Sequence, residues 1–144
     1  WPNNMASTAE PVWIKVELAL AIHDRQLAEH GGPIGVRDAS ALESALARPR
    51  NQWAYGEADL CALAAAYAFG VARNHPFTDG NKRTAWVLAR LFLALNDVRI
   101  AFEPEDAIEM VLLLAAGKLA EDEVTAWLSA RRACSANMAD IGLH

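Results

Sequence analysis

The most constraining feature of this 144-residue sequence is the segment from Ala58 to about Asn74, which is apolar on nearly every side. Leu60, Leu63 and Phe69 stand there among many alanines. A helix that is hydrophobic all round must be buried on all sides. The segment therefore predicts a central helix, around which the rest of the chain packs.

The flanking segments predict further helices, because apolar residues recur at helical spacing and proline, glycine or a capping residue marks most of the ends. Alanine and leucine are abundant and only 8 residues are glycine, which favours helices over short strands. The fold class expected is therefore all-α, a single compact bundle of about six helices. The other expected helices run from Pro11 to before Gly31, from Asp38 or Ser40 to about Arg48, from Lys82 to Asn96, from Pro104 to Gly117 and from Glu121 to about Arg132.

A chain of this length fits one domain. We expect that domain at residues 11–133, after a disordered N-terminus or cloning remnant at 1–10 in which Met5 is the native start. Residues 134–144 are expected to form a frayed tail. Pro49 disfavours helical geometry in the residue before it, so residues 49–57, which mix aromatic and polar side chains, predict a surface loop or short hairpin.

Charge and cysteine content exclude several classes of protein. The net charge of −5 gives no bulk attraction to nucleic acid or to an anionic membrane. Cys61 and Cys134 lie far apart and near no Cys/His cluster, which favours buried free thiols in a reducing cytosol. The longest apolar run, Cys61 to Phe69, is too short to span a bilayer. We therefore expect a cytoplasmic protein with no direct nucleic-acid or membrane partner.

One polar segment, from Arg73 to Arg83, joins the two most apolar helices. Gly80 permits a tight or left-handed turn. The backbone N–H groups after it lead into a helix N-terminus, where unpaired donors and the helix dipole favour an anion. Lys82 and Arg83 oppose that dipole unless something negative binds. The segment therefore predicts a phosphate site.

Each of these residues also has a purely structural interpretation. His75 could bind a carbonyl at the helix end, Asp79 could cap the next helix, and the two cations could form a solvated face. Phe77 is expected in the core under either interpretation. The joint occurrence favours the functional interpretation, since the structural one needs several independent coincidences.

The segment His75-Pro76-Phe77-Thr78-Asp79-Gly80-Asn81-Lys82-Arg83 resembles the Fic/Doc family motif at every fixed position. The continuation to Ala85, with upstream stretches such as Ile22-His23 and Gly35-Val36-Arg37-Asp38, is similar to the Doc toxin branch. The resemblance covers roughly residues 12 to 130. It implies the Fic/Doc fold, binding of ATP with Mg²⁺ at the motif loop, and modification of a protein hydroxyl.

The resemblance also implies a role for each residue of the motif. His75 matches the general base, and Asp79 matches the ligand of Mg²⁺. Phosphate binding falls to Gly80, Asn81, Lys82, Arg83 and an additional basic residue, Arg73, with Arg83 also catalytic.

Fic/Doc proteins carry a flap that aligns the target by strand addition. At the corresponding place, between the second and third expected helices, stand Arg50, Asn51, Gln52, Trp53, Ala54 and Tyr55. The alternative is an ordinary surface loop whose aromatic side chains pack inward.

The leading hypothesis is a Doc-type toxin that transfers a phosphoryl group from ATP to a translation protein, with elongation factor Tu as the target that the family suggests. The first alternative is AMP transfer, and the second is an inactive Fic-like interaction module. AMP-transferring relatives continue the motif as Gly-Asn-Gly-Arg-x-x-Arg. Here Lys82 replaces a glycine and Trp86 replaces the second arginine, so one phosphate clamp is lost and phosphoryl transfer is favoured.

The resemblance further implies a small antitoxin that binds in trans through its C-terminal segment. The sequence shows no inhibitory helix of the Fic kind, so inhibition is expected to come from this partner.

Overall fold

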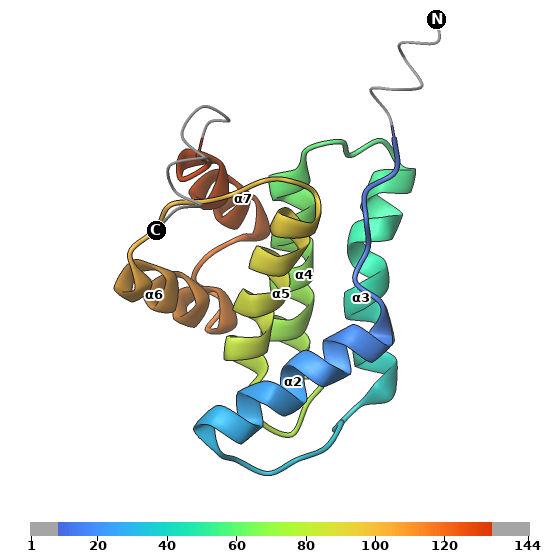
Figure 1. Ribbon diagram of the computed structural model, residues 1–144, viewed down its shortest axis with the longest axis vertical. Coiled ribbons are helices and arrows are strands. Elements are labelled where there is room, and N and C mark those ends of the chain that lie inside the picture. The colour runs from blue at the N-terminus through green and yellow to red at the C-terminus, as the bar shows by residue number, and fades with distance from the viewer. Residues whose placement is uncertain (1–8, 134–144) are drawn as a thin grey trace, which may run out of the picture.

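The computed structural model describes residues 9–133, which form an all-α arrangement of six helices (Figure 1). They are α2 (Val16–His30), α3 (Ala39–Ala54), α4 (Leu60–Asn74), α5 (Asn81–Leu95), α6 (Pro104–Ala115) and α7 (Glu121–Ala130). The predicted fold class is confirmed for this part of the chain. The expectations for residues 1–8 and 134–144 lie outside the described residues. None of the helices described is long and apolar enough to cross a membrane.

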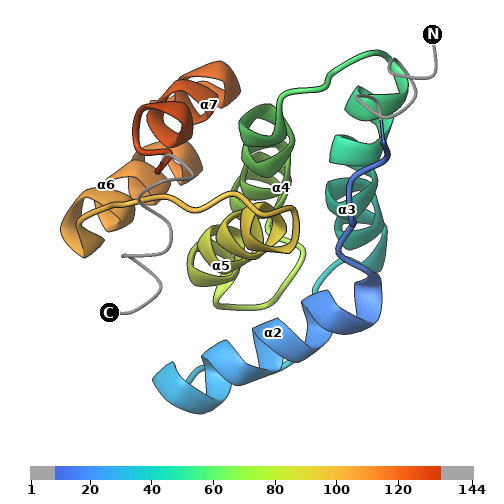
Figure 2. The ribbon, with the colours of Figure 1, turned by 45° about the horizontal axis from the view of Figure 1, so that its top comes forward.

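The central helix is α4, as its all-round apolar sequence predicts. Figure 2 shows it between α3 on one side and α6 and α7 on the other, with α5 alongside. Ten of its residues are buried. At Gly70 the approach of α3 is so close that a Cβ atom would lie 2.9 Å from the Cα atom of Ala45. The glycine therefore allows the two backbones to touch.

The N-terminal helix begins at Val16, so the predicted start at Pro11 was wrong by five residues. Residues 11–15 are extended and pair their backbone with side chains of the bundle. The N–H of Val12 donates to Asn96 Oδ1 at 2.8 Å, and Asn96 Nδ2 donates back to the Val12 carbonyl at 3.0 Å. The N–H of Ile14 donates to the hydroxyl of Tyr67 at 3.0 Å. These bonds replace those that a helical turn would supply.

The prediction of a loop or hairpin at residues 49–57 was also wrong for most of that range, because α3 continues through Pro49 to Ala54. A proline inside a helix costs about 3 kcal/mol. Packing beyond it offsets this cost: the Trp53 ring meets the Trp13 ring edge-on at 6.2 Å, and Gln52 Nε2 donates to Glu121 Oε2 at 2.9 Å. Only residues 55–59 connect α3 to α4.

The other helix ends follow the predicted signals closely. Asp38, and not Ser40, caps α3, since the N–H of Ala41 donates to Asp38 Oδ1 at 3.0 Å. Asp59 caps α4 through the N–H of Cys61. Pro104 is the first residue of α6, where its missing N–H costs nothing.

Three elements meet at the lower end of α4 and α5 in Figure 1: the loop of residues 75–80, the helix α2 and the segment of residues 31–38. The segment 31–38 runs antiparallel to the loop through a bridge between Val36 and Phe77. The N–H of Thr78 donates to the Gly35 carbonyl at 3.1 Å, and the N–H of Arg37 donates to the Pro76 carbonyl at 2.8 Å. Phe77 is 1% exposed, as expected of a core residue.

Candidate active site

A cavity of about 560 Å³ lies beside the loop 75–80 and has one polar and one apolar wall. The loop and the first turn of α5 form the polar wall, which contains all the titratable motif residues except Arg73. The side chains of α5, α6 and the connection between them form the apolar wall, which comprises Trp86, Phe102, Pro104, Ala107, Ile108, Val111 and Leu112.

His75 lies where α4 ends, and its exposed side chain lines the cavity. Its backbone is left-handed, with φ 49° and ψ 58°, an uncommon conformation for a residue other than glycine. Arg37 stabilises this turn, since its Nε donates to the His75 carbonyl at 2.7 Å and its Nη2 to the Asn74 carbonyl at 2.9 Å. Within residues 9–133 nothing hydrogen-bonds to the imidazole, so it can act on a molecule in the cavity.

The first turn of α5 is the place where the sequence predicts an anion site. Gly80 adopts φ +79° at the N-cap position and turns the chain into the helix. In the part of the chain that the structure describes, no acceptor meets the N–H groups of Asn81, Lys82 and Arg83. The side chains of Lys82 and Arg83 are exposed beside these donors. Unpaired N–H groups and two cations at one helix N-terminus favour a phosphate.

The side chain of Asn81 has a structural role that the sequence did not indicate. Its Nδ2 donates to the Phe77 carbonyl at 2.9 Å, and its Oδ1 accepts from the Phe77 N–H at 3.0 Å. The amide is buried and closes the loop on itself. Asn81 therefore offers only its backbone N–H to a phosphate, while its side chain shapes the loop.

Asp79 presents an exposed carboxylate to the cavity. Its Oδ1 accepts from the N–H of Gly80 at 2.8 Å. Residues 9–133 contain no group of three His, Cys, Asp or Glu side chains that could enclose a metal. One carboxylate still fits Mg²⁺, which proteins usually hold through one or two carboxylates together with substrate phosphates and water. The residues present therefore fit a magnesium ion that arrives with a nucleotide.

Arg73 does not join the other motif residues at the cavity. Its guanidinium lies over the Phe69 ring, 5.0 Å from the centroid, and close to Gly117. The structure thus places this predicted phosphate ligand toward the connection between α6 and α7.

The predicted flap residues Arg50–Tyr55 do not line the cavity either. Trp53 packs inward against Trp13, whereas Tyr55 is 92% exposed. The segment that lies along the motif loop is instead residues 31–38, which the sequence analysis used as a helix stop, as a helix start and as part of the family resemblance, but not as a flap. Its glycines, at positions 31, 32 and 35, were the available signal.

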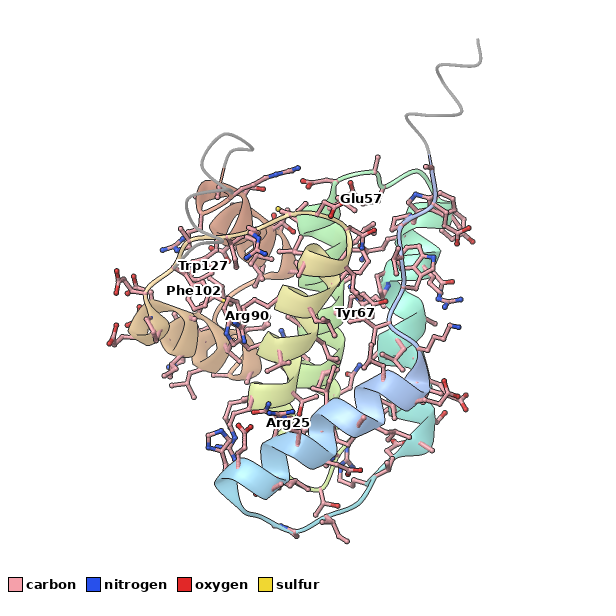
Figure 3. The ribbon with its side chains drawn as sticks, in the orientation of Figure 1. Arg25, Glu57, Tyr67, Arg90, Phe102 and Trp127 are labelled. Carbon is pink, nitrogen blue, oxygen red and sulfur yellow. The ribbon has the colours of Figure 1, made fainter. Side chains whose placement is uncertain are left out.

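Trp86 occupies the position where AMP-transferring relatives have their second arginine. Its ring meets Phe102 edge-on at 5.0 Å and Trp127 edge-on at 5.8 Å. Figure 3 shows Phe102, Trp127 and Arg90 gathered on the side of α5 that faces α6 and α7. Trp86 is therefore part of an aromatic cluster, of which Trp86 and Phe102 belong to the apolar wall, and it gives the cavity no guanidinium.

The cavity thus brings together an imidazole, a carboxylate, two cations and a helix N-terminus, which are the groups that an enzyme site for phosphate chemistry needs. The comparisons with known proteins agree. The model of the Fic/DOC family matches residues 13–93, and the chain belongs to this family. It is 36% identical over 112 residues to Protein kinase doc of Escherichia phage P1, covering 77% of this chain and 88% of that protein. It is 38% identical over 104 residues to Toxin Doc of Mycolicibacterium smegmatis (strain ATCC 700084 / mc(2)155), covering 69% of this chain and 79% of that protein. The two names agree with the predictions of a Doc-type toxin and of a Fic/Doc-type kinase.

Proposed function

We propose that the chain is the toxin of a toxin–antitoxin pair and transfers the γ phosphoryl group of ATP to a serine or threonine hydroxyl of a translation protein. Elongation factor Tu is the candidate target that the family resemblance suggests. The observation that carries this proposal is the meeting of His75, Asp79 and the N–H groups of residues 81–83 on one cavity. The name of the phage P1 relative supports the choice of a kinase.

The proposed reaction is an in-line displacement at phosphorus. The target hydroxyl oxygen forms the new bond to the γ phosphorus while the bond to the bridging β–γ oxygen breaks, and ADP leaves. His75 accepts the proton of the attacking hydroxyl. The N–H groups of the first turn of α5, with Lys82 and Arg83, stabilise the phosphate charge. A magnesium ion held by Asp79 would neutralise further phosphate charge.

Phosphoryl transfer is favoured over AMP transfer by two side chains of α5. Lys82 brings bulk and a point charge where the AMP-transferring motif has a glycine. Trp86 packs into the aromatic cluster, so the planar guanidinium clamp for the terminal phosphate is missing at that position. A pose with the γ phosphate beside His75 therefore fits better than one with the α phosphate there. The intact motif argues against the third possibility, an inactive interaction module.

We assign target alignment to residues 31–38 in place of Arg50–Tyr55. In an antiparallel pair the backbone groups of successive residues alternate between the two edges. Since Gly35 and Arg37 bond to the motif loop, the N–H and carbonyl of Val36 face the opposite edge. The side chain of Ile34 beside it is 81% exposed. An extended target segment can add to this edge and bring its hydroxyl to His75.

Two further elements of the proposal come from the family resemblance. A small antitoxin would bind in trans through its C-terminal segment, and both proteins would act in the cytoplasm. The net charge of −5 supports the view that any DNA contact belongs to the antitoxin and not to this chain.

The test incubates the purified chain with a host lysate and ATP labelled at either the α or the γ phosphate. Label from the γ position on one translation protein is expected, and label from the α position would show AMP transfer instead. The control is His75→Asn, because asparagine tolerates the left-handed backbone of this position while it lacks the imidazole. If neither label is transferred by the wild-type chain, the inactive module is the correct assignment.

A further inference from the structure

Asp79 is contacted from outside the motif loop by a buried histidine of α2. His23 is 2% exposed, and its Nε2 lies 2.7 Å from the Asp79 carbonyl oxygen. A carbonyl only accepts, so this nitrogen carries the proton and donates. The imidazole also stacks on the Phe77 ring, with the centroids 3.7 Å apart and the planes 7° from parallel. His23 therefore holds the loop by a ring contact and by a hydrogen bond.

A second residue outside the loop meets the Asp79 carboxylate. Gly32, in the segment 31–38, lies so close that a Cβ atom there would be 2.5 Å from Oδ2 and 3.3 Å from Cγ of Asp79. Only glycine leaves room for the carboxylate in its observed place. The backbone of Gly32, with φ +120°, is also one that other residues rarely adopt.

The carboxylate is thus positioned from three sides. Its Oδ1 accepts from the Gly80 N–H at 2.8 Å, its Oδ2 faces Gly32, and its own main chain is bound by His23. Asp79 is exposed and its side chain makes no ion pair among residues 9–133. Without these neighbours the side chain would be free to sample other rotamers, and a metal would have to order it on binding.

We propose that His23 and Gly32 are positioning residues that hold the Asp79 carboxylate where it can bind the magnesium ion of a bound nucleotide; this inference rests on the proposed function. Neither residue touches the substrate, and each acts only through Asp79. Residues that orient a metal ligand in this way typically change metal affinity by about 10–100-fold when they are replaced. The helix α2 and the segment 31–38 are therefore part of the metal site, although neither supplies a ligand.

The experiment measures ATP binding by calorimetry at a series of Mg²⁺ concentrations, with the full chain and its variants. His23→Phe keeps a stacked ring and loses the donor, while His23→Gln retains an N–H donor. Gly32→Ala places a methyl group against the carboxylate. Its matched control is Gly56→Ala in the connection between α3 and α4, which has a similar φ of +109° but whose Cβ would meet no atom within 4 Å. Tyr67→Phe removes a buried hydrogen bond to Ile14, outside the cavity lining, and controls for lost stability.

We expect His23→Phe and Gly32→Ala to need about tenfold more Mg²⁺ for half-maximal ATP binding. His23→Gln, Gly56→Ala and Tyr67→Phe should stay near the wild-type value, and thermal unfolding of each variant reports whether it folds. A wild-type Mg²⁺ dependence in His23→Phe, or an equal loss in Tyr67→Phe, would overturn this inference alone. Absence of Mg²⁺-dependent ATP binding in the wild-type chain would overturn the proposed function and this inference together.

Discussion

Arg37 binds the main chain at His75, donating from Nε to the His75 carbonyl at 2.7 Å and from Nη2 to the preceding carbonyl of Asn74 at 2.9 Å. The last carbonyls of a helix carry partial negative charge, so a guanidinium there is favourable. Through these two bonds, a side chain far upstream in the sequence fixes the left-handed turn that presents the imidazole to the cavity.

Replacement of this arginine should therefore affect both stability and transfer. We expect Arg37→Ala to lower the free energy of unfolding by about 1–2 kcal/mol, since two charge-assisted bonds at a partly solvated site are lost. Transfer to the target should fall by about tenfold or more because the imidazole loses its fixed orientation. Urea unfolding and the labelled-ATP assay measure the two effects.

The control for Arg37 is Arg25→Ala, which removes an exposed arginine paired only with Glu29 one turn away. Such a pair contributes about 0.5 kcal/mol or less. If the two variants behaved alike in both assays, the turn at His75 would not depend on Arg37.

The buried amide of Asn81 leads to a second prediction. Asn81→Ala would leave the N–H and the carbonyl of Phe77 without their partners. Since each unsatisfied buried group costs about 1–3 kcal/mol, we expect a loss of about 2–4 kcal/mol in the free energy of unfolding. Asn81→Asp keeps the acceptor for the Phe77 N–H, but it places a buried carboxylate oxygen against the Phe77 carbonyl and should lose at least as much near neutral pH. Unfolding in urea measures both losses, and a wild-type stability of Asn81→Ala would show that its side chain does not hold the loop.

Cys61 gives a prediction about reactivity. Its side chain is buried, and burial raises the pKa of the thiol above its ordinary value. A raised pKa means less thiolate at a given pH, and the thiolate is the form that reacts. In a Cys134→Ser variant, alkylation at pH 8 should therefore be slow in the folded protein and fast in urea, as mass spectrometry would show. Fast labelling of the folded chain would mean that the interface of α4 and α7 opens readily.

The core of this site was predictable from the sequence because its signals are local. Gly80 stands at the point where the chain turns into α5, a turn that needs a positive φ. The polar run from Arg73 to Arg83 is easily recognised between two apolar helices. The ends of α4 and α5 depend on such residues and were predicted within two positions. The prediction of an anion site follows from the helix start itself and needs no knowledge of the tertiary structure.

The rest depends on contacts between segments distant in the sequence. Pro49 is a strong local signal for a helix end, but packing of Trp53 on Trp13 and the bond from Gln52 to Glu121 carry α3 past it. The extended start at Val12 likewise depends on Asn96, more than eighty residues away. Periodicity does not report such pairings.

The position of the target-aligning segment can be tested with one variant and one matched control. Ile34 lies on the segment that pairs with the motif loop, and its apolar side chain is 81% exposed. Tyr55 is 92% exposed at the C-terminal end of α3 and does not line the cavity. We expect Ile34→Asp to reduce target modification by about tenfold, because an apolar contact of the added strand becomes a buried charge.

The same variant should bind ATP as the wild type does, since Ile34 does not line the cavity. Tyr55→Ala should change neither quantity. The measurement follows target labelling at several target concentrations, and a loss of alignment would appear as a raised KM. The opposite pattern, with Tyr55→Ala impaired and Ile34→Asp active, would return target alignment to residues 50–55, where the sequence first placed it.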